Sequence, residues 1–415
     1  MNMMLQSAPP VMTERRVTML GALLVAVGPI SMALYTPAMP EIVRAFGTTE
    51  AAVKLTLSLY FAGFAFAQLF CGPLSDGFGR RPVTIGFMLI YLAASIAALL
   101  SPSLEVLIAA RFVQGIGAAV GMAISRAIVR DLFTHESSAR IMSTIGMVLA
   151  VGPAFSPAIG GVTMQLFGWH AIFVLMAVFG VAIVLAVIFS VKETVVRDLS
   201  RIRPRAILRS YASLLSSPYF LSTSMIMGGS VGALYTLATV LPFILINRVG
   251  LTPVEFGLGM LMQSGSYFVG SLVARLLMGR MGSTALVPIG VGCIAAGSIA
   301  LCILMHLMEP TFWNVMGPVG AYAFGIAFIM PAISTASLAP FPHIAGAASS
   351  LSGFFQMGAG LVGSVVIAAF GDPVVAISIV IPAMGFVTFV CWAIWRSLPE
   401  PRYLAAPPAD LPPTP

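Results

Sequence analysis

Long apolar stretches alternate with short polar ones along most of the chain. Each apolar stretch has about 20 residues, the length that a helix needs to cross the hydrocarbon core of a bilayer. The pattern therefore predicts an all-α polytopic membrane protein with twelve spans, and this even number leaves both chain ends on one side. The expected spans lie at about residues 17–40, 52–72, 83–101, 104–128, 139–164, 169–190, 219–246, 253–278, 284–306, 311–338, 344–369 and 374–395.

Composition supports this prediction. The chain of 415 residues is 59% hydrophobic and 8% charged, whereas a soluble domain carries about 25% charged residues. In a membrane protein the net charge of +7 reports orientation and does not indicate a nucleic-acid partner.

Basic residues are strongly biased toward one side of the expected spans. Positive charge is enriched in the cytoplasmic loops of membrane proteins, so both termini are expected in the cytoplasm. The N-terminal side carries Arg15, Arg16, Arg80, Arg81, Arg130, Arg140, Lys192, Arg197, Arg201, Arg203, Arg205, Arg209, Arg280, Arg396 and Arg402, and the opposite side carries Arg44, Lys54 and Arg248.

The widest polar gap, at 191–217, divides the spans into two groups of six. Its basic residues alternate with leucines and a tyrosine, which is typical of an amphipathic helix on an anionic membrane surface. A disordered basic linker is the alternative. The expected parts are a tail at 1–16, a six-helix bundle at 17–190, the linker at 191–217, a second bundle at 218–396 and a disordered tail at 397–415.

The segment from Gly72 to Pro82 joins the second and third expected spans. Its glycines and prolines are turn residues, and its charged side chains are costly in hydrocarbon. We therefore expect a loop at the membrane surface. The charged residues follow Gly72 at fixed positions: Asp76, Arg80 and Arg81.

Arg111 lies about seven residues into the fourth expected span, roughly 10 Å from its start. A charge at this depth normally faces a water-filled cavity or a partner group. One interpretation is a cavity residue that contacts substrate or takes part in ion coupling. The other is an arginine whose donors are satisfied by the carbonyls of a kinked neighbouring helix.

The fifth expected span carries small residues at four-residue spacing, which places them on one helix face. The prolines and paired glycines that follow bend helices and permit close helix contact. We predict a packing surface against a helix of the other half. Its residues are Gly146, Ala150, Gly152, Pro153, Ala154, Pro157, Ala158, Gly160 and Gly161.

In these motifs the chain resembles the major facilitator superfamily of transporters. Gly72 to Pro82 is similar to the loop signature of that superfamily, Arg111 to Gly117 to its fourth-helix signature, and Gly152 to Gly161 to the fifth-helix signature of its drug exporters. Four further strings resemble the bicyclomycin/chloramphenicol-type efflux subfamily, namely Tyr35 to Pro40, Ser125 to Asp131, Trp169 to Phe173 and Ala345 to Leu351.

The resemblance implies a proton-driven exporter with alternating access in a bacterial inner membrane, working as a monomer and without a cofactor. It also implies roles for individual residues. Asp76, Arg80 and Asp131 would form a charge relay at the cytoplasmic face, and Gly72 and Arg81 would belong to the same group of gating residues. Arg111 would be the cavity arginine.

One position departs from the subfamily pattern. The subfamily usually has an aspartate two residues before Tyr35, where this chain has Ala33. All acidic residues of the chain fall in expected loops, tails or span ends, although proton antiport needs a group whose pKa changes between two environments. Glu41, near the outer end of the first span, is the nearest candidate for proton coupling. Asp76 and Asp131 are the next candidates, and a weakly coupled or uncoupled protein is the alternative.

Without a central acid, Arg111 would leave the cavity positive, so we expect neutral, zwitterionic or anionic substrates. Aromatic rings with a polar tip, and amides, suit a loose binding site. Each of these residues could instead serve packing alone. The candidates are Tyr35, Tyr60, Gln114, Tyr235, Gln263, Tyr267, Tyr322 and Gln356.

Three functions remain open from the sequence. An exporter of drugs or other toxic small molecules is favoured by the span-five motif and the subfamily strings. A facilitator or importer of a small metabolite is favoured by the missing central acid. A non-transporting scaffold or sensor is the third. An enzyme is not indicated, because we find no phosphate-binding loop, no clustered metal ligands and no Ser/His/Asp set.

Overall fold

The computed structural model describes residues 11–133, 135–195, 197–198 and 204–399, and the regular elements of this part of the chain are all helices. The first half contains α1 (Glu14–Tyr35), η1 (Thr36–Ala38), α2 (Met39–Ala45), α3 (Glu50–Phe78), α4 (Arg80–Leu99), α5 (Leu104–Leu132), α6 (His135–Phe167) and α7 (Trp169–Ser190). The short helix α8 (Pro204–Leu215) follows. The second half contains α9 (Pro218–Leu245), α10 (Pro253–Met281), α11 (Ser283–Leu307), α12 (Phe312–Leu338), η3 (Pro342–Ile344), α13 (Ala345–Ala369) and α14 (Pro373–Ser397).

The fold class expected from the sequence is confirmed. Within the described residues, ten helices are both long enough and apolar enough to cross a membrane. α6 and α10, with 33 and 29 residues, are also long enough to cross a membrane. Together they give two bundles of six long helices each.

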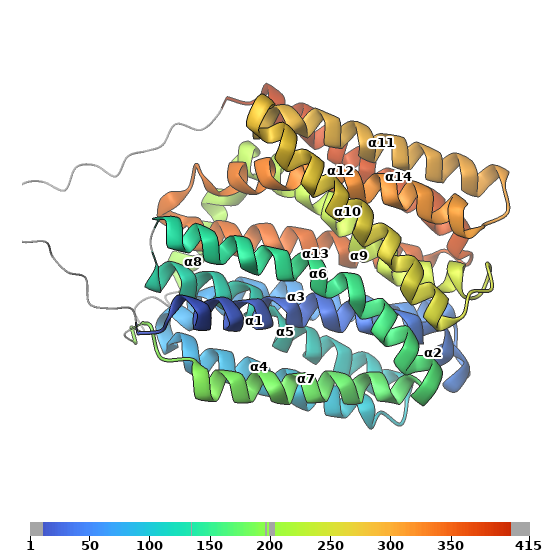
Figure 1. Cartoon of the computed structure of the whole chain (residues 1–415), viewed down its shortest axis with the longest axis horizontal. Coiled ribbons are helices and arrows are strands. Elements are labelled where there is room, and N and C mark those ends of the chain that lie inside the picture. Colours follow the sequence, from blue (N-terminus) through green and yellow to red (C-terminus); the bar gives the residue numbers. More distant parts are fainter. Residues whose placement is uncertain (1–10, 134, 196, 199–203, 400–415) are drawn as a thin grey trace, which may run out of the picture.

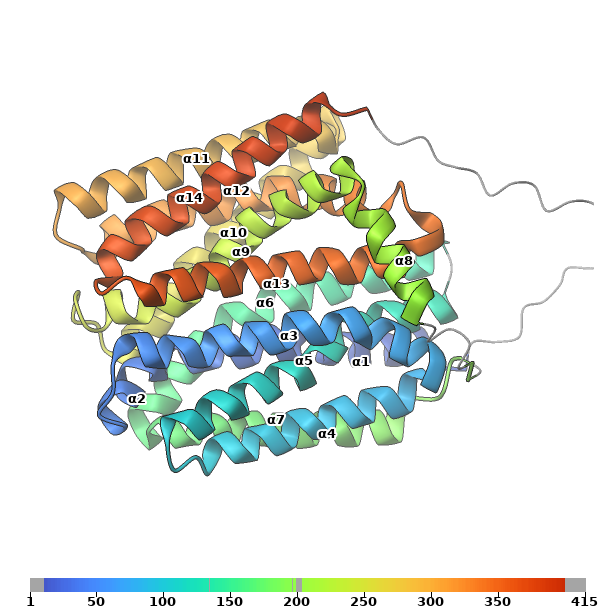
Figure 2. The ribbon, with the colours of Figure 1, turned by 180° about the vertical axis from the view of Figure 1, so that it is seen from behind.

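The arrangement of the bundles explains which helices are most buried and which present apolar side chains to the outside. α4 and α7 form one edge of the molecule and α11 and α14 form the opposite edge, with the other long helices between them (Figures 1 and 2). The most apolar window of α9 is 89% buried, whereas that of α4 is 33% buried. Large apolar side chains on the edge helices, such as Val178 and Ile299, are exposed and are suited to contact lipid tails.

The two bundles meet along two helix pairs, α3 with α13 and α6 with α10. The α6–α10 crossing is so close that backbone meets backbone. A Cβ atom on Gly161 would lie 2.2 Å from the carbonyl oxygen of Pro253, and one on Gly257 would lie 2.3 Å from that of Pro157. Such contacts require the absence of a side chain, so these glycines set the distance between the bundles here.

The small residues expected on α6 contact both bundles. A Cβ on Gly160 would lie 2.3 Å from the Leu34 carbonyl oxygen of α1, and Gly152 lies beside Ile30 of the same helix. The Cα of Ala158 faces Gly257, while Ala154 is partly buried. Three further members, Gly146, Ala150 and Pro153, lie within α6, but their side chains fall outside the described part of the structure.

The prediction of a loop from Gly72 to Pro82 is wrong, because most of this segment is helical. α3 continues through Pro73 to Phe78, α4 begins at Arg80, and Gly79 alone separates the two helices at φ +104°. Glycine adopts this left-handed conformation without a steric penalty. The turn residues mislead because a single glycine suffices for the reversal, and because a helix can tolerate a proline where neighbouring groups satisfy the freed carbonyl.

Glu193 completes this turn from outside the motif. Its carboxylate accepts hydrogen bonds from the backbone N–H groups of Arg80 (2.8 Å) and Arg81 (3.2 Å), which are free donors at the first turn of α4. The residues after α7 are therefore attached to the α3–α4 turn. The sequence reasoning did not identify this role.

The amphipathic helix expected in the linker is present as α8 (Pro204–Leu215), and one side of it is buried against protein. Leu214 is fully buried, and the Tyr211 hydroxyl donates a hydrogen bond of 2.7 Å to the Leu69 carbonyl of α3. Burial raises the pKa of Tyr211 to about 12, so the phenol remains a donor at neutral pH. Leu208 and Leu215 remain exposed.

We expect Gly257→Ala to push α10 away from α6, because the added Cβ would overlap a backbone oxygen that cannot move alone. Double electron–electron resonance between spin labels at Leu166 and Leu258, both exposed, should report a longer distance than in the parent protein.

Gly265→Ala is the matched control, since no atom lies within 4 Å of a Cβ at that position of α10. An unchanged distance distribution in Gly257→Ala would contradict the glycine-set crossing.

Candidate functional site

A cavity of about 550 Å³ lies between the two bundles. Its wall is built by α1, α3, α5 and α6 of the first bundle and by α9, α10, α12 and α13 of the second. It extends from Thr36 and Pro157, beside the α6–α10 crossing, to Ser337 and Leu338 at the end of α12. The cavity therefore reaches toward the face that carries α8 and is covered at the opposite face.

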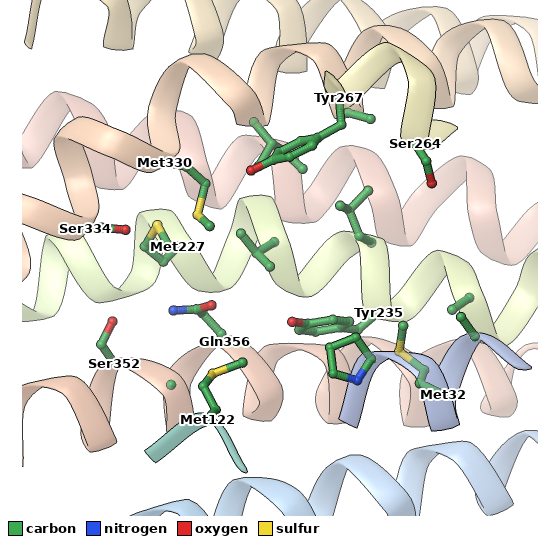
Figure 3. A pocket seen from close by; sticks show the side chains of 18 of the residues that line it. Met32, Met122, Met227, Tyr235, Ser264, Tyr267, Met330, Ser334, Ser352 and Gln356 are labelled. Carbon is green, nitrogen blue, oxygen red and sulfur yellow. The ribbon is translucent and has the colours of Figure 1, made fainter. Parts of the chain in front are cut away.

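Four of the predicted candidates line this cavity: Tyr235, Gln263, Tyr267 and Gln356. Figure 3 shows Tyr235, Tyr267 and Gln356 projecting into the same space from α9, α10 and α13. All four come from the second bundle.

Methionines supply much of the remaining surface. Met32 and Met122 lie on the wall of the first bundle, and Met227 and Met330 lie on that of the second (Figure 3). Methionine side chains are flexible and polarizable, so they adapt to ligands of different shape. Together with the tyrosine rings they form an apolar wall with scattered hydroxyl and amide groups.

Arg111 differs from the expectation, because it does not line the cavity. It is fully buried inside the first bundle, with its guanidinium carbon 4.4 Å from the ring centroids of both Tyr35 and Tyr60. It also donates a hydrogen bond to Gln114. Two aromatic faces and an amide oxygen thus solvate this charge in part, its Nε and Nη2 have no hydrogen-bond partner among the described residues, and no described carboxylate lies within ion-pair distance.

The residues around Arg111 are tied to several helices. The Tyr35 hydroxyl bonds to Thr56 of α3 at 2.7 Å, and the Tyr60 hydroxyl donates to the Gly28 carbonyl of α1 at 2.9 Å. The Gln114 amide donates to Ser95 of α4 at 2.7 Å. Tyr35, Tyr60 and Gln114 therefore hold α1, α3, α4 and α5 together and do not reach the cavity.

Tyr322 behaves in the same way in the second bundle. It is buried, and its hydroxyl donates a hydrogen bond of 2.8 Å to the Gly229 carbonyl of α9. It is not among the residues that line the cavity.

Arg126 is the cavity cation that the sequence reasoning missed. It lies on α5 about four turns beyond Arg111, its side chain is accessible from within the cavity, and its guanidinium donates to the Ser349 hydroxyl of α13 at 3.1 Å. Arg126 lies within the segment from Ser125 to Asp131, which resembles the efflux subfamily and could have drawn attention to it. The depth of Arg111 in the membrane favoured it as the cavity residue. Which arginine faces the cavity depends instead on the direction of its side chain around the α5 axis.

The residues expected at the cytoplasmic face come together in space. Arg80 is 2% exposed and forms ion pairs with Asp76 of α3 and, at 3.0 Å, with Asp131 of α5. Gly72 lies beside Ser350 of α13, where a Cβ would be 3.5 Å from the hydroxyl oxygen.

Arg81 is exposed and points elsewhere, donating to the Ile188 carbonyl at 2.9 Å. The structure thus separates the two adjacent arginines, one inside the ion-pair cluster and one on the surface of the bundle.

Glu41 does not lie on the cavity. It sits on α2, forms an ion pair of 3.0 Å with Arg44, and both side chains are substantially exposed. None of the described residues that line the cavity is acidic.

An ion pair within α3 contacts the second bundle at the covered end. Lys54 of α3 is 1% exposed, lies 3.5 Å from the Glu50 carboxylate, and places its ammonium 4.8 Å from the ring centroid of Phe243 in α9. The Asn247 amide, just beyond α9, donates to Glu50 at 3.0 Å. These contacts depend on the covered end being closed.

Comparisons with known proteins agree with this architecture. Residues 21–364 match the family model described as Major Facilitator Superfamily. The chain is 27% identical over 375 residues to multidrug resistance protein D of Escherichia coli (strain K12), covering 89% of this chain and 93% of that protein. It is 29% identical over 341 residues to a chloramphenicol resistance protein of Pseudomonas aeruginosa, covering 81% and 79%.

Among solved structures, a D-xylose-proton symporter superposes with a TM-score of 0.73 at 14% identity, covering 94% of this chain and 98% of that one. At this identity the likeness concerns the fold alone.

We expect Arg80→Gln to lower the free energy of unfolding by about 2 kcal/mol, because it leaves the largely buried Asp131 carboxylate without its cation. Arg81→Gln removes the same charge one residue away and should change stability by less than about 0.5 kcal/mol. Thermal unfolding of the purified protein, with the two variants side by side, measures the difference. Equal effects of the two substitutions would contradict the assignment of the buried cluster to Arg80.

Proposed function

Because this chain belongs to the Major Facilitator Superfamily, we propose that it is a secondary transporter that exports drugs or other small amphiphilic molecules. Membership of this family makes the chain a multi-pass membrane transporter and not an enzyme. The direction of transport and the class of cargo are the proposed part.

The observation that carries the proposal is the cavity between the bundles. It is lined by both halves, has methionine and tyrosine walls, and is covered at the end where α6 crosses α10. Such a site accepts apolar molecules of varied shape and can open to either side if the bundles rock about it. The names of the relatives, multidrug resistance protein D and chloramphenicol resistance protein, agree with that cargo.

The orientation follows from the distribution of basic residues. With both termini in the cytoplasm of a bacterial cell, the cavity reaches the cytoplasmic face, from which an exporter loads. The protein is proposed to act as a monomer in the inner membrane, with no cofactor and no nucleic-acid partner.

Substrate charge follows from the wall of the cavity. Its described lining contains the cation Arg126 and no acid, so neutral, zwitterionic or anionic molecules are favoured over lipophilic cations. The basis of this preference therefore moves from Arg111 to Arg126.

Coupling is proposed to be proton antiport through a carboxylate at the covered end. Glu41 is the candidate from the sequence. Glu50 has the stronger support, because it pairs with Lys54 of its own helix and accepts a hydrogen bond from Asn247 of the second bundle, which would be lost as that end opens.

An uncoupled facilitator of a small metabolite is the second candidate function. One observation favours it, namely that the cavity carries no acid among its described lining residues.

We expect proteoliposomes containing the parent protein to move chloramphenicol against its gradient only when a pH gradient is imposed. Glu50→Gln should lower the dependence on the pH gradient by about tenfold or more, whereas Glu41→Gln, at an exposed surface pair, should have a smaller effect.

Ethidium provides the comparison for charge and should be moved much less than chloramphenicol. Equal equilibration of chloramphenicol with and without the gradient would instead support the facilitator. Strong export of ethidium would contradict the charge preference.

A further inference from the structure

The wall of the cavity holds one strong, unbalanced charge. Among the described residues that line it, Arg126 is the single ionised side chain. Its guanidinium donates to the Ser349 hydroxyl at 3.1 Å, and no described carboxylate lies within 4 Å of it. A hydroxyl supplies no counter-charge, so the guanidinium retains the capacity to bind an anion bidentately.

Hydroxyl groups accompany this charge. Ser349 and Ser352 line the cavity from α13, and Ser334 and Ser337 line it from α12. A serine hydroxyl can donate as well as accept, so it can turn toward an anion that binds at Arg126. The charged end of the cavity is thus rich in donors.

Deeper in the cavity, a buried side-chain oxygen lacks a hydrogen-bond donor. The side-chain oxygen of Gln263 is buried and has no donor among the described residues, although the residue lines the cavity. The side-chain oxygen of Gln68 also lacks a donor among the described residues, but Gln68 lies beside Met122 and Gly353, nearer to Arg126. A buried acceptor without a donor is costly, so these amides favour a ligand that carries an N–H or O–H group.

The two ends are separated along the membrane normal. Arg126 lies roughly 9 Å from the end of α5, and Gln263 roughly 27 Å from the end of α10, at 1.5 Å per residue. Both helices end at the face that carries α8. Along the helix axes these two distances differ by roughly 18 Å, and the inclination of α10 (Figure 1) makes the difference in depth smaller than that. Met122 and Tyr235 line the apolar wall of the same cavity.

We propose that the cavity binds elongated amphiphilic organic anions, with a carboxylate at Arg126 and a hydrogen-bond donor near Gln263. This inference rests on the proposed transport function and narrows its substrate class. Arg126 binds the charge, the methionine and tyrosine wall holds the apolar body, and Gln263 accepts from the distal donor. Because Arg126 lies toward the proposed cytoplasmic side, the anionic end binds near the entrance.

The test uses 11-(dansylamino)undecanoic acid and its methyl ester. The acid carries a carboxylate at one end and a sulfonamide N–H about 14 Å away, whereas the ester differs only in lacking the charge. Fluorescence titration in lipid nanodiscs, corrected with empty nanodiscs, gives Kd for each compound. We expect the parent to bind the acid about tenfold more tightly than the ester, as for one charge-assisted contact.

Arg126→Gln should abolish this preference, and Arg126→Lys should restore part of it. Arg130→Gln is the matched control, because it removes the same charge four residues along α5 from an exposed side chain outside the cavity lining. It should keep the ratio of the parent. Gln263→Leu should weaken both compounds to a similar degree, since both retain the sulfonamide.

An equal ratio in the parent and in Arg126→Gln would overturn the proposal, and so would a parent that binds neither compound. The ratio measured in the parent needs no variant, so a misfolded Arg126→Gln would not remove the test. Export assays in inside-out vesicles distinguish a failure of the proposed transport function from a failure of the proposed anion site. Intact acid-selective binding without export of any compound would contradict the transport function and leave the anion site standing.

Discussion

The contact between α6 and α10 is the constraint on which the rest of the structure depends. Gly161 and Gly257 allow the two backbones to touch, and any larger residue would hold them apart. Because the bundles are fixed closely at this end, the space between them lies toward the face that carries α8. The cavity, its wall from both halves and its single covered end all follow from that crossing.

The charged residues within the helices are placed according to what can solvate them. Arg111 has two tyrosine rings and an amide, and therefore stays inside one bundle as part of its packing. Lys54 has Glu50 and the face of Phe243, so its solvation depends on contact between the bundles. Arg126 has one hydroxyl and faces the cavity. Burial costs the least where the partners are already present.

Much of the fold could be predicted from the sequence, because the length of an apolar run is a direct physical requirement of the bilayer. The twelve spans and the two groups of six follow from that requirement. Helix ends were harder to place. α3 continues to Phe78 because a single glycine makes the turn and Glu193, more than 100 residues away in the chain, caps the next helix.

The candidate site was predicted less completely. Tyr235, Gln263, Tyr267 and Gln356 line the cavity, whereas Tyr35, Tyr60, Arg111 and Gln114 form a cluster inside the first bundle. Sequence gives the depth of a residue in the membrane, but the direction of its side chain depends on how the helices are rotated and packed. Arg126 was missed for this reason.

The attachment of the linker has a mechanical consequence. Asp198 donates its backbone N–H to the Gly77 carbonyl, and Tyr211 of α8 donates to Leu69, so two points of the linker are tied to α3. Leu214 of α8 packs with Phe220 of α9 in the second bundle. A movement that separates α9 from α3 at this face would stretch the hydrogen bond between Tyr211 and Leu69. α8 therefore contacts both bundles at this face and connects the ends of α3 and α9 there.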